Sequence, residues 1–515
     1  MINRMVYTLG GGGGSGLSEG GTVSGDLTIT GDLKVQGGGS FTYDEIVEGT
    51  FGVAPDGTNY RFLIDDNSRV SLSNNDSGTS NTIFGSSQGT IDSGSNENVF
   101  IGHGIAGQDN LADAKYNVVV GYNAGNYLSQ GDHNVLLGRN AGSVLTTGSR
   151  SVMIGTSAGS ASATSSYHVL MGYQAGFAIN DTAANGTISI GYQAGTAITS
   201  GAGNTALGYQ SLLTHVTGSR NLAIGYQAMY DTDSGDNANA LNDNMAIGYQ
   251  AMGGAIANYA GTSNNIAIGN YALQGNLLAS IGNIAIGYKA MNQPTRGEYN
   301  VAIGQQAMEL GTADNNDDNV VIGYQAAKMA ASGQLLDSVM IGYQAGLGGS
   351  GDINYSVAIG HSALKSTSSN DVANTVAVGY KALTSLTTGG DNTAIGFEAS
   401  ELLTTGASNI SVGYQALTAA DGTESYNVAI GNLAMGSVNH DGADNNVAVG
   451  FNALRGGTGE LDLCVAIGAY SLDSTASNDH TGAIAIGGYS LASLTSGTQN
   501  LAIGYEALKE HTTGD

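Results

Sequence analysis

Two short strings in the chain match a pattern used by serine hydrolases. Residues 85–89 (GSSQG) and 155–159 (GTSAG) both read G-x-S-x-G. In those enzymes the serine lies on a turn between a strand and a helix, and it needs a histidine and an acid beside it. Neither string is followed by a helical pattern, and both coincide with glycines that recur along the chain. We therefore expect no catalytic residue and no enzyme.

Three other features suggest cofactor chemistry. Residues 102–107 (GHGIAG) match the dinucleotide pattern G-x-G-x-x-G, but they too lie on the recurring glycines and no helix is expected after them. The eight histidines show no spacing typical of metal ligands. The acidic loops 231–236 and 314–318 carry oxygen ligands that suit Ca²⁺, although we favour solvated loops. Apart from this Ca²⁺ alternative, no cofactor and no metal-site residue are predicted.

Eight tyrosines, each followed by glutamine, recur at the same place in a repeat. They are Tyr173, Tyr192, Tyr209, Tyr226, Tyr249, Tyr324, Tyr343 and Tyr414. Side chains at one repeat position of stacked strands form a ladder, in which neighbouring rings stabilise one another. Ring faces and amides also suit weak binding of glycans. We favour a stabilising role and keep the glycan-facing ladder as the alternative.

The composition indicates a chain that turns often and still buries apolar strands. Of 515 residues, 82 are Gly and two are Pro, while 41% are hydrophobic and 11% charged. The formal charge of −27 leaves no basic stripe for a phosphate backbone, so nucleic acid is not an expected partner. Because Cys464 is the single cysteine, no disulfide within the chain is expected.

The main signal is an internal repeat, N-x-A-I-G-Y-Q-A-L followed by a polar loop. The glycine after the short apolar run, called here the marker glycine, occurs 24 times from Gly85 to Gly504, often 17 residues apart, as between Gly208 and Gly225. Seventeen residues are too few for a helical-hairpin repeat or a propeller blade. The fold class predicted is all-β, a parallel β-solenoid (β-roll) of about 24 short coils.

Apolar residues alternate on both sides of the marker glycine. Leu222 and Ile224 share one face of the expected strand and Ala223 points to the other, and the alternation resumes after Gly225. We interpret the glycine as a corner between two short strands, with the bulky face buried. The alanine face would then need a partner, and three copies around one axis would cover it. This interpretation predicts a homotrimer.

The residue four places after the marker glycine changes along the chain. It is glycine in five early repeats, such as Gly125 and Gly176, and mostly Leu or Met afterwards, with Gly346 as a late exception. This change indicates either a narrower neck and a better filled shaft, or drift between tolerated residues.

The chain divides into three expected parts. Residues 1–20 read as an anchor peptide with a glycine tether, residues 21–80 as a small β adaptor module, and residues 81–515 as the repeat shaft. The expected anchor residues are Met5, Val6, Tyr7 and Leu9. No signal peptide and no membrane-spanning segment are expected, because no apolar run is long enough.

The N-x-A-I-G unit, as at residues 427–431 and 500–504, resembles the head repeats of YadA-like trimeric autotransporter adhesins. The form N-x-A-I-G-Y-Q-A with a T-T-G-S loop, after the tandem element of residues 25–36, is similar to tail-fibre and other virion fibre proteins of bacteriophages. The first resemblance implies trimers of parallel β-rolls. The sequence shows no pattern of the coiled-coil stalk or membrane strands that an autotransporter would need, so we expect a virion protein.

These observations predict a phage tail fibre that projects a trimeric solenoid and attaches the virion to a host surface. Its expected partners are two further copies of itself, a tail or capsid protein bound through the N-terminus, and a glycan or protein of the host. The expected location is the virion, outside the cell after lysis. The alternatives are a capsid-decorating fibre, a bacterial trimeric surface adhesin and, with less support, a glycan depolymerase.

Overall fold

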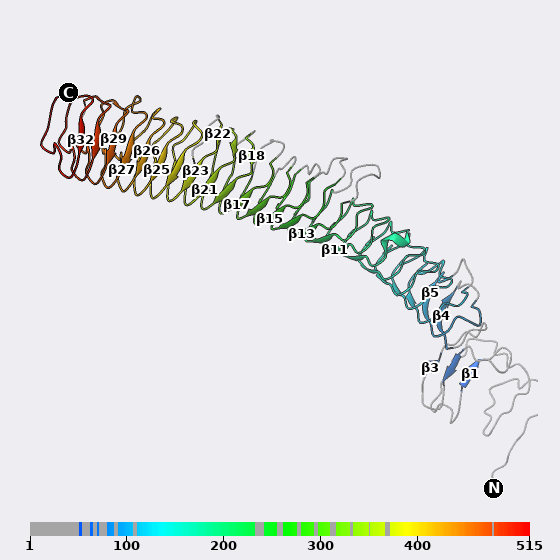
Figure 1. Ribbon diagram of the computed structural model, residues 1–515. Coiled ribbons are helices and arrows are strands. Elements are labelled where there is room, and N and C mark those ends of the chain that lie inside the picture. Colours follow the sequence, from blue (N-terminus) through cyan, green and yellow to red (C-terminus); the bar gives the residue numbers. More distant parts are fainter. Residues whose placement is uncertain are drawn as a thin grey trace, which may run out of the picture.

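The chain folds into a long, gently bent rod of stacked coils (Figure 1). The computed structural model describes residues 51–53, 62–64, 70–71, 80–86, 91–106, 111–231, 241–254, 261–275, 280–292, 297–309, 316–329, 333–349, 351–365, 371–475 and 478–514. The expected anchor residues Met5, Val6, Tyr7 and Leu9 lie outside these ranges.

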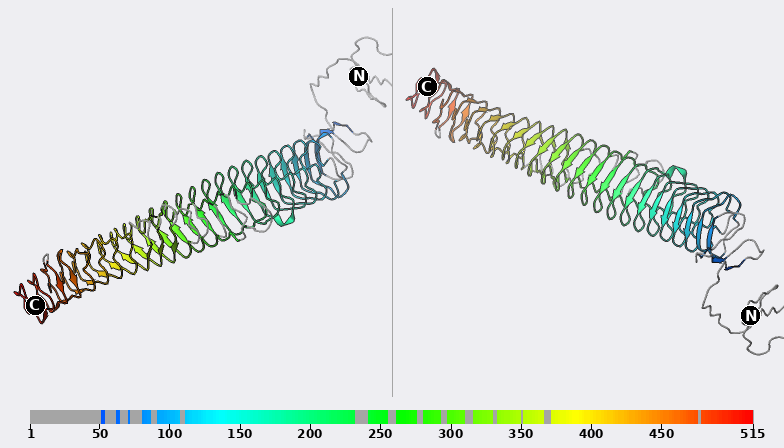
Figure 2. Two further views of the ribbon diagram at one scale, coloured as in Figure 1. Left: turned by 90° about the horizontal axis from the view of Figure 1, so that it is seen from above. Right: turned by 90° about the horizontal axis from the view of Figure 1, so that it is seen from below.

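One parallel sheet of 24 strands runs along the rod, with one strand from each coil (Figure 2). Each strand pairs with those of the coils before and after it, from β4 at one end to β32 at the other. The strands are β4 (Thr82–Ser86), β5 (Val99–His103), β6 (Val118–Val120), β7 (Val135–Leu137), β8 (Val152–Ile154), β9 (Val169–Met171), β10 (Ile188–Ile190), β11 (Thr205–Leu207), β12 (Leu222–Ile224), β13 (Met245–Ile247), β14 (Ile266–Ile268), β15 (Ile284–Ile286), β16 (Val301–Ile303), β17 (Val320–Ile322), β19 (Val339–Ile341), β21 (Val357–Ile359), β23 (Val376–Val378), β24 (Thr393–Ile395), β25 (Ile410–Val412), β26 (Val428–Ile430), β27 (Val447–Val449), β29 (Val465–Ile467), β31 (Ile484–Ile486) and β32 (Leu501–Ile503). The predicted all-β parallel solenoid is therefore confirmed.

Short secondary sheets accompany the main one. They contain β18 (Leu335–Leu336), β20 (Ile353–Asn354) and β22 (Val372–Ala373), and β28 (Leu461–Asp462) with β30 (His480–Thr481). Before the coils, β1 (Phe51–Val53), β2 (Phe62–Ile64) and β3 (Val70–Ser71) form an antiparallel sheet. A single 3₁₀ turn, η1 (Thr182–Ala184), is the one helical element of the described residues. The extent of the adaptor module, 21–80, stays a prediction.

The marker glycines form a column along one corner of the rod. Gly155 has φ +129°, and a Cβ there would lie 2.5 Å from the carbonyl oxygen of Gly172 in the next coil. A side chain would thus meet both backbone strain and the neighbouring main chain. This close approach explains why the marker is glycine, as expected for a corner.

The expected second strand after the marker glycine is wrong. Residues 226–229 form turns, because Gln227 and Met229 adopt left-handed conformations with φ 53° and 50°. Two left-handed residues, separated by one residue, curve the chain away from the sheet and back into the coil. The alternation of residue types there runs along a turn and not along a strand.

The inside and outside of the coil are also the reverse of the prediction. Ala223 is completely buried, whereas its neighbours Leu222 and Ile224 are part-exposed on the outer surface. In every strand of the main sheet from β6 to β32 the central residue is likewise buried and its two neighbours are part-exposed or exposed. The strand turns its central residue inward, in most coils a small one because a 17-residue coil encloses little space, and it turns the two flanking residues outward. The alanine face therefore needs no partner, and that argument for a trimer is wrong.

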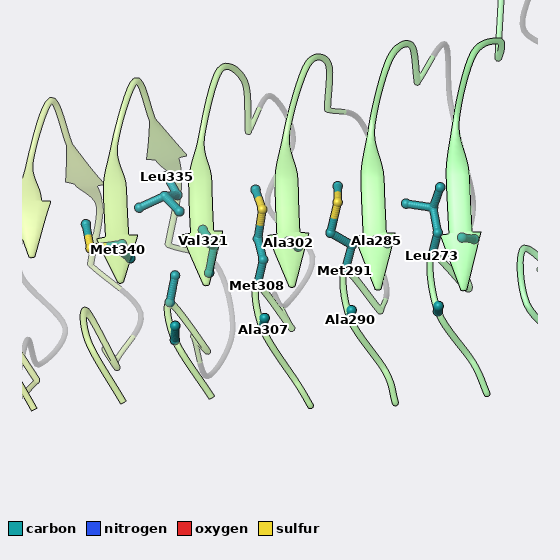
Figure 3. Packing of buried hydrophobic residues seen from close by; sticks show 14 of the residues in the cluster. Leu273, Ala285, Ala290, Met291, Ala302, Ala307, Met308, Val321, Leu335 and Met340 are labelled. Atoms are coloured by element: carbon teal, nitrogen blue, oxygen red, sulfur yellow. The ribbon is translucent and has the colours of Figure 1, made fainter. Parts of the chain in front are cut away.

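The core is filled by two positions that share one space. Where the strand contributes a small residue, such as Ala285 or Ala302, the residue four places after the marker glycine is large, as at Met291 and Met308 (Figure 3). Where the strand contributes a large residue, the other is small. Glycine is the small partner in the pairs Val119 with Gly125, Leu136 with Gly142, Met153 with Gly159, Leu170 with Gly176, and Met340 with Gly346, and alanine is the small partner in the pairs Phe100 with Ala106 and Val321 with Ala327. Two coils have small residues at both positions, Ser189 with Gly195 and Ala394 with Ser400.

Atomic contacts show why the two positions compensate. A Cβ on Gly176 would lie 2.6 Å from Cδ2 of Leu170, and one on Gly346 would lie 2.5 Å from Sδ of Met340. Four of the five early glycines thus mark coils filled from the strand side, whereas Gly195 faces the small residue Ser189. The exception at Gly346 has the same cause as those four, so a narrower neck is not needed to explain them.

A buried column of asparagines, four places before the marker glycine, joins the coils. The Nδ2 of Asn283 donates to Oδ1 of Asn265 (3.0 Å) and to the carbonyl of Gly297 (2.8 Å). Its Oδ1 in turn accepts hydrogen bonds from the backbone N and the Nδ2 of Asn300, both at 3.0 Å. Every hydrogen-bonding group of the side chain is paired, as burial requires. We call this column the asparagine ladder.

Candidate functional site

An apolar stripe follows the outer surface of the main sheet. It consists of the residues one and three places before each marker glycine, and we call it the outward stripe. The position next to the glycine is apolar in all 24 coils: Phe84, Ile101, Val120, Leu137, Ile154, Met171, Ile190, Leu207, Ile224, Ile247, Ile268, Ile286, Ile303, Ile322, Ile341, Ile359, Val378, Ile395, Val412, Ile430, Val449, Ile467, Ile486 and Ile503. The other position is apolar except at Thr82, Thr205 and Thr393.

Every side chain of the outward stripe is exposed or part-exposed, and those from Leu222 to Ile341 are all part-exposed. Leu207, Ile395 and Ile467 each expose about two-fifths of their surface, at 41%, 39% and 39%. Ile, Leu and Val are normally buried, and a contiguous exposed patch of them marks an interaction site. Sequence reasoning identified these residues but placed them in the core.

Beside the outward stripe, one residue after each marker glycine, lies the tyrosine ladder. The eight predicted tyrosines all occupy this column. Successive rings from Tyr173 to Tyr249 stack with centroids 5.2, 5.1, 5.0 and 5.2 Å apart and interplanar angles of 12°, 8°, 6° and 6°. Tyr324 and Tyr343 begin a second run, which reaches Tyr414. The sequence prediction missed His361, Tyr380 and Phe397 within that run, because they do not precede glutamine.

Stacking limits what this surface offers to a ligand. Inside each run both faces of a ring are covered by its neighbours, so the ring edges and phenolic oxygens remain exposed. A sugar that packs on an aromatic face would find one only at the end of a run. The geometry favours the stabilising role, and glycan binding by the ladder stays a prediction.

The glutamines after the tyrosines form a parallel ladder of amides. The Nε2 of Gln193 donates to Oε1 of Gln174 (3.0 Å), and Gln210 donates in the same way to Gln193 (3.0 Å). The pattern continues through Gln227 and Gln250. Because these amides bond to one another, they link successive coils beside the tyrosine ladder and offer few free groups to a ligand.

A histidine interrupts the asparagine ladder. His168 is 1% exposed, and neither ring nitrogen has a hydrogen-bond partner among the described residues. Burial disfavours the charged imidazolium and lowers the pKa of His168 to about 4. Ser151 and Thr187 stand at the equivalent positions of the adjoining coils, so the amide ladder is absent across three coils.

A buried carboxylate lies in the segment before β26, where its residue borders the asparagine ladder through the bond from Asn409 Nδ2 to the carbonyl oxygen of Glu424 (2.8 Å). Glu424 is completely buried, and its Oε2 accepts a hydrogen bond from the backbone N of Gly422 (2.9 Å). Burial raises the pKa of this carboxyl above its ordinary value. In the part of the chain that the structure describes, no hydrogen bond joins it to a second carboxylate or a histidine, although the charges of Asp421 and Asp441 also raise its pKa.

Metal-ligating side chains do not gather in the described residues. No group of three or more His, Cys, Asp or Glu there is arranged to hold an ion. Most of the acidic loop 231–236 and part of 314–318 lie outside the described ranges, so the Ca²⁺ alternative is untested there. Cys464 is buried in the asparagine column, where burial raises its pKa to about 11.

None of the described helical segments has the length and apolar character needed to cross a bilayer.

Comparison of the chain with protein-family models, with curated proteins and with solved structures finds no match in any of the three. The repeat, the rod and its surface columns are therefore the features that bear on its function.

Proposed function

We propose that the chain is the shaft of a homotrimeric virion fibre, of the phage tail-fibre kind, which attaches the virion to a host surface. The observation that carries the proposal is the outward stripe, which continues from the first coil to the last. A rod of 24 coils at the β spacing of about 4.8 Å is on the order of 115 Å long, a shape suited to spacing and display.

The stripe favours a second copy of the chain over an unrelated partner. Its apolar residues repeat at the coil spacing over the whole rod, so a binding surface must present the same spacing over the same length. Another copy, aligned in parallel and in register, has this property by construction. A globular partner would cover a few coils and leave the rest exposed.

Three copies are proposed because the repeat resembles the YadA-like heads, whose β-rolls are trimers. Three rods around one axis would turn their outward stripes toward one another and bury them. The polar loops, which take the length changes between repeats, would face the solvent and the host. Attachment to the virion would come from the anchor residues of segment 1–20.

The proposal predicts that charge on the stripe prevents assembly and leaves each rod folded. Ile303→Glu places a carboxylate on the stripe, whereas Gln305→Glu in the same coil places one on the exposed column beside it. Light scattering should give three chain masses for the wild type and for Gln305→Glu. An Ile286→Glu/Ile303→Glu/Ile322→Glu variant should give one mass, with an unchanged β-sheet circular dichroism spectrum.

A wild-type mass of one chain would remove the fibre proposal, as would a triple variant that remains trimeric. Negative-stain imaging of the trimer should show rods on the order of 100 Å in length. Binding of these rods to host cells then tests the attachment role separately.

A further inference from the structure

The tyrosine ladder combines accessible phenols with a neighbour for each of them. The sequence has no tryptophan, and the one cysteine, Cys464, is buried. Tyrosine is therefore the side chain of the described rod that gives up a single electron most readily. Tyr192, Tyr209 and Tyr226 expose 44%, 42% and 44% of their surface, so small oxidants can reach them.

The geometry of the ladder holds each phenol beside another. Tyr209 has one ring 5.1 Å away in the preceding coil and one 5.0 Å away in the following coil, with planes within 8° and 6° of parallel. In such a stack the carbon atoms ortho to one hydroxyl lie beside the same atoms of the next ring. The main-chain ladder and the glutamine ladder keep this register.

Edge-on contacts between rings of neighbouring coils also occur beside the ladder. Tyr271, which stands two places after its marker glycine and so outside the ladder column, has its ring centroid 5.2 Å from that of Tyr249 and its plane 70° from parallel. Rotation of a tyrosine ring about its Cβ–Cγ bond is soft, so stacked pairs can reach tilted arrangements. Such a rotation brings two ortho carbons together without separating the coils.

We propose that the tyrosine ladder is a modification site at which a one-electron oxidant joins tyrosines of consecutive coils as dityrosine. Each of two neighbouring phenols loses one electron to the oxidant and its hydroxyl proton to water, which gives two phenoxyl radicals. A carbon–carbon bond forms between their ortho positions. The hydrogens on those two carbons then move to the oxygens, which restores both phenols. Persulfate is the final acceptor. It takes up the two electrons that the phenols lose and is reduced to two sulfate ions.

The product would close coils covalently in a chain that lacks disulfides. A bond between Tyr192 and Tyr209 links residues 17 positions apart and spans one complete coil. A coil closed in this way cannot unwind, and its open states are restricted as a disulfide restricts an unfolded loop. Oxidation would thus harden the rod coil by coil.

Three tyrosines outside the ladder show whether exposure alone decides which tyrosines react. Tyr299, Tyr355 and Tyr426, five places before their marker glycines, are more exposed, at 57%, 58% and 62%. None of them has a tyrosine at the same position of an adjoining coil. If exposure alone decided the reaction, these tyrosines would react first and would join chains to one another.

The experiment uses the full chain with tris(bipyridine)ruthenium(II), light and persulfate. The net charge of −27 attracts this dicationic complex to the rod. Dityrosine is detected by its fluorescence and located by mass spectrometry of proteolytic peptides. We expect the main products to join Tyr173–Tyr192, Tyr192–Tyr209, Tyr209–Tyr226 and Tyr226–Tyr249 within one chain.

Matched variants separate stacking from exposure. Tyr209→Phe keeps an aromatic ring in the stack and removes one phenol, so it should eliminate two of the four bonds in this run and spare Tyr173–Tyr192. Tyr299→Phe should leave the yield of all four unchanged. Amide exchange in residues 173–249 should slow after oxidation of the wild type. The proposal is overturned if oxidation gives mainly hydroxylated single rings, or bonds that involve Tyr299, Tyr355 or Tyr426.

Discussion

Exchanging the two core residues of a single coil should show that they fill one space. Met340 fills its coil from the strand, opposite Gly346, whereas in the coil of β16 Ala302 lies opposite Met308. The backbone is alike in both, since φ is +62° at Gly346 and 52° at Met308. A Met340→Ala/Gly346→Met double variant therefore converts one kind of coil into the other.

Each single substitution should be costly. Met340→Ala leaves a void and is expected to destabilise the coil by about 2–4 kcal/mol. Gly346→Met puts a Cβ 2.5 Å from Sδ of Met340 and overfills the space, at about 1–3 kcal/mol. The double variant should lie within about 1–2 kcal/mol of the wild type, because a left-handed residue other than glycine carries a cost of that order.

Local stability is the quantity to measure, since a long solenoid does not unfold as one unit. Hydrogen exchange of peptides covering residues 339–347 reports opening of this coil, and each 1.4 kcal/mol changes the exchange rate about tenfold. Peptides from the coil of β16 serve as the internal control. If the double variant exchanges as fast as the sum of the two single effects predicts, the two positions do not share a space and the account of the core is wrong.

Two further substitutions test the buried polar column. The pKa of His168 in the folded chain, about 4, lies below the ordinary value of 6.5, so the unfolded chain binds the proton first as the pH falls. The free energy of unfolding should therefore decrease between pH 6.5 and pH 4, by about 3 kcal/mol in all. His168→Asn should abolish this loss, which protection factors of residues 152–171 at pH 7 and pH 5 would reveal; an equal loss in the variant would assign it to other groups. Asn283→Asp should destabilise its coil by about 3 kcal/mol or more, because a buried carboxylate would face the oxygens of Asn265 and Gly297 that Nδ2 now donates to. Asn264→Asp is the matched control, because the side chain of Asn264 is exposed. Similar amide exchange rates in the Asn283→Asp and Asn264→Asp variants would contradict the stabilising role of the asparagine ladder.

The repeat predicted the fold because its period equals the number of residues in one coil. Strands of successive coils pair at the repeat spacing, as Thr205 with Leu222, so the glycine spacing read from the sequence is the circumference of a coil. Insertions such as the one between Gly225 and Gly248 fall in loops, where they leave the pairing of β12 with β13 unchanged.

The side of the strand that faces inward could not be predicted from alternation. A period of two separates Leu222 and Ile224 from Ala223 but does not say which face is buried. The usual preference for large apolar residues inside misled here, because in this coil the narrow interior is already filled by Met229, four places after the marker glycine, which leaves room for only a small residue on the strand. A usable signal was present in Asn221, which has the same parity as Ala223. A polar residue that recurs on one face of a strand, at a fixed distance from a glycine corner, is better explained by a buried ladder than by solvent.

The tyrosine ladder was predictable as a column, since equal positions of a solenoid must stack. Its chemistry was not, because the sequence does not give the angle between rings. Only the observed planes, 6° apart for Tyr209 and Tyr226, show that ring faces are covered and edges are free.

The hydrogen bonds between coils run along the rod, and this direction determines how the molecule would respond to tension. A force applied to the two ends loads the main-chain and asparagine bonds of the terminal coil first, so coils should peel away singly and not shear together. Each released 17-residue coil would lengthen the chain by about 50 Å, given about 3.3 Å per extended residue less the 4.8 Å that the coil occupied. A rod of this kind would be stiff under small loads and would then yield in equal steps, each of which dissipates energy while the remaining coils stay intact.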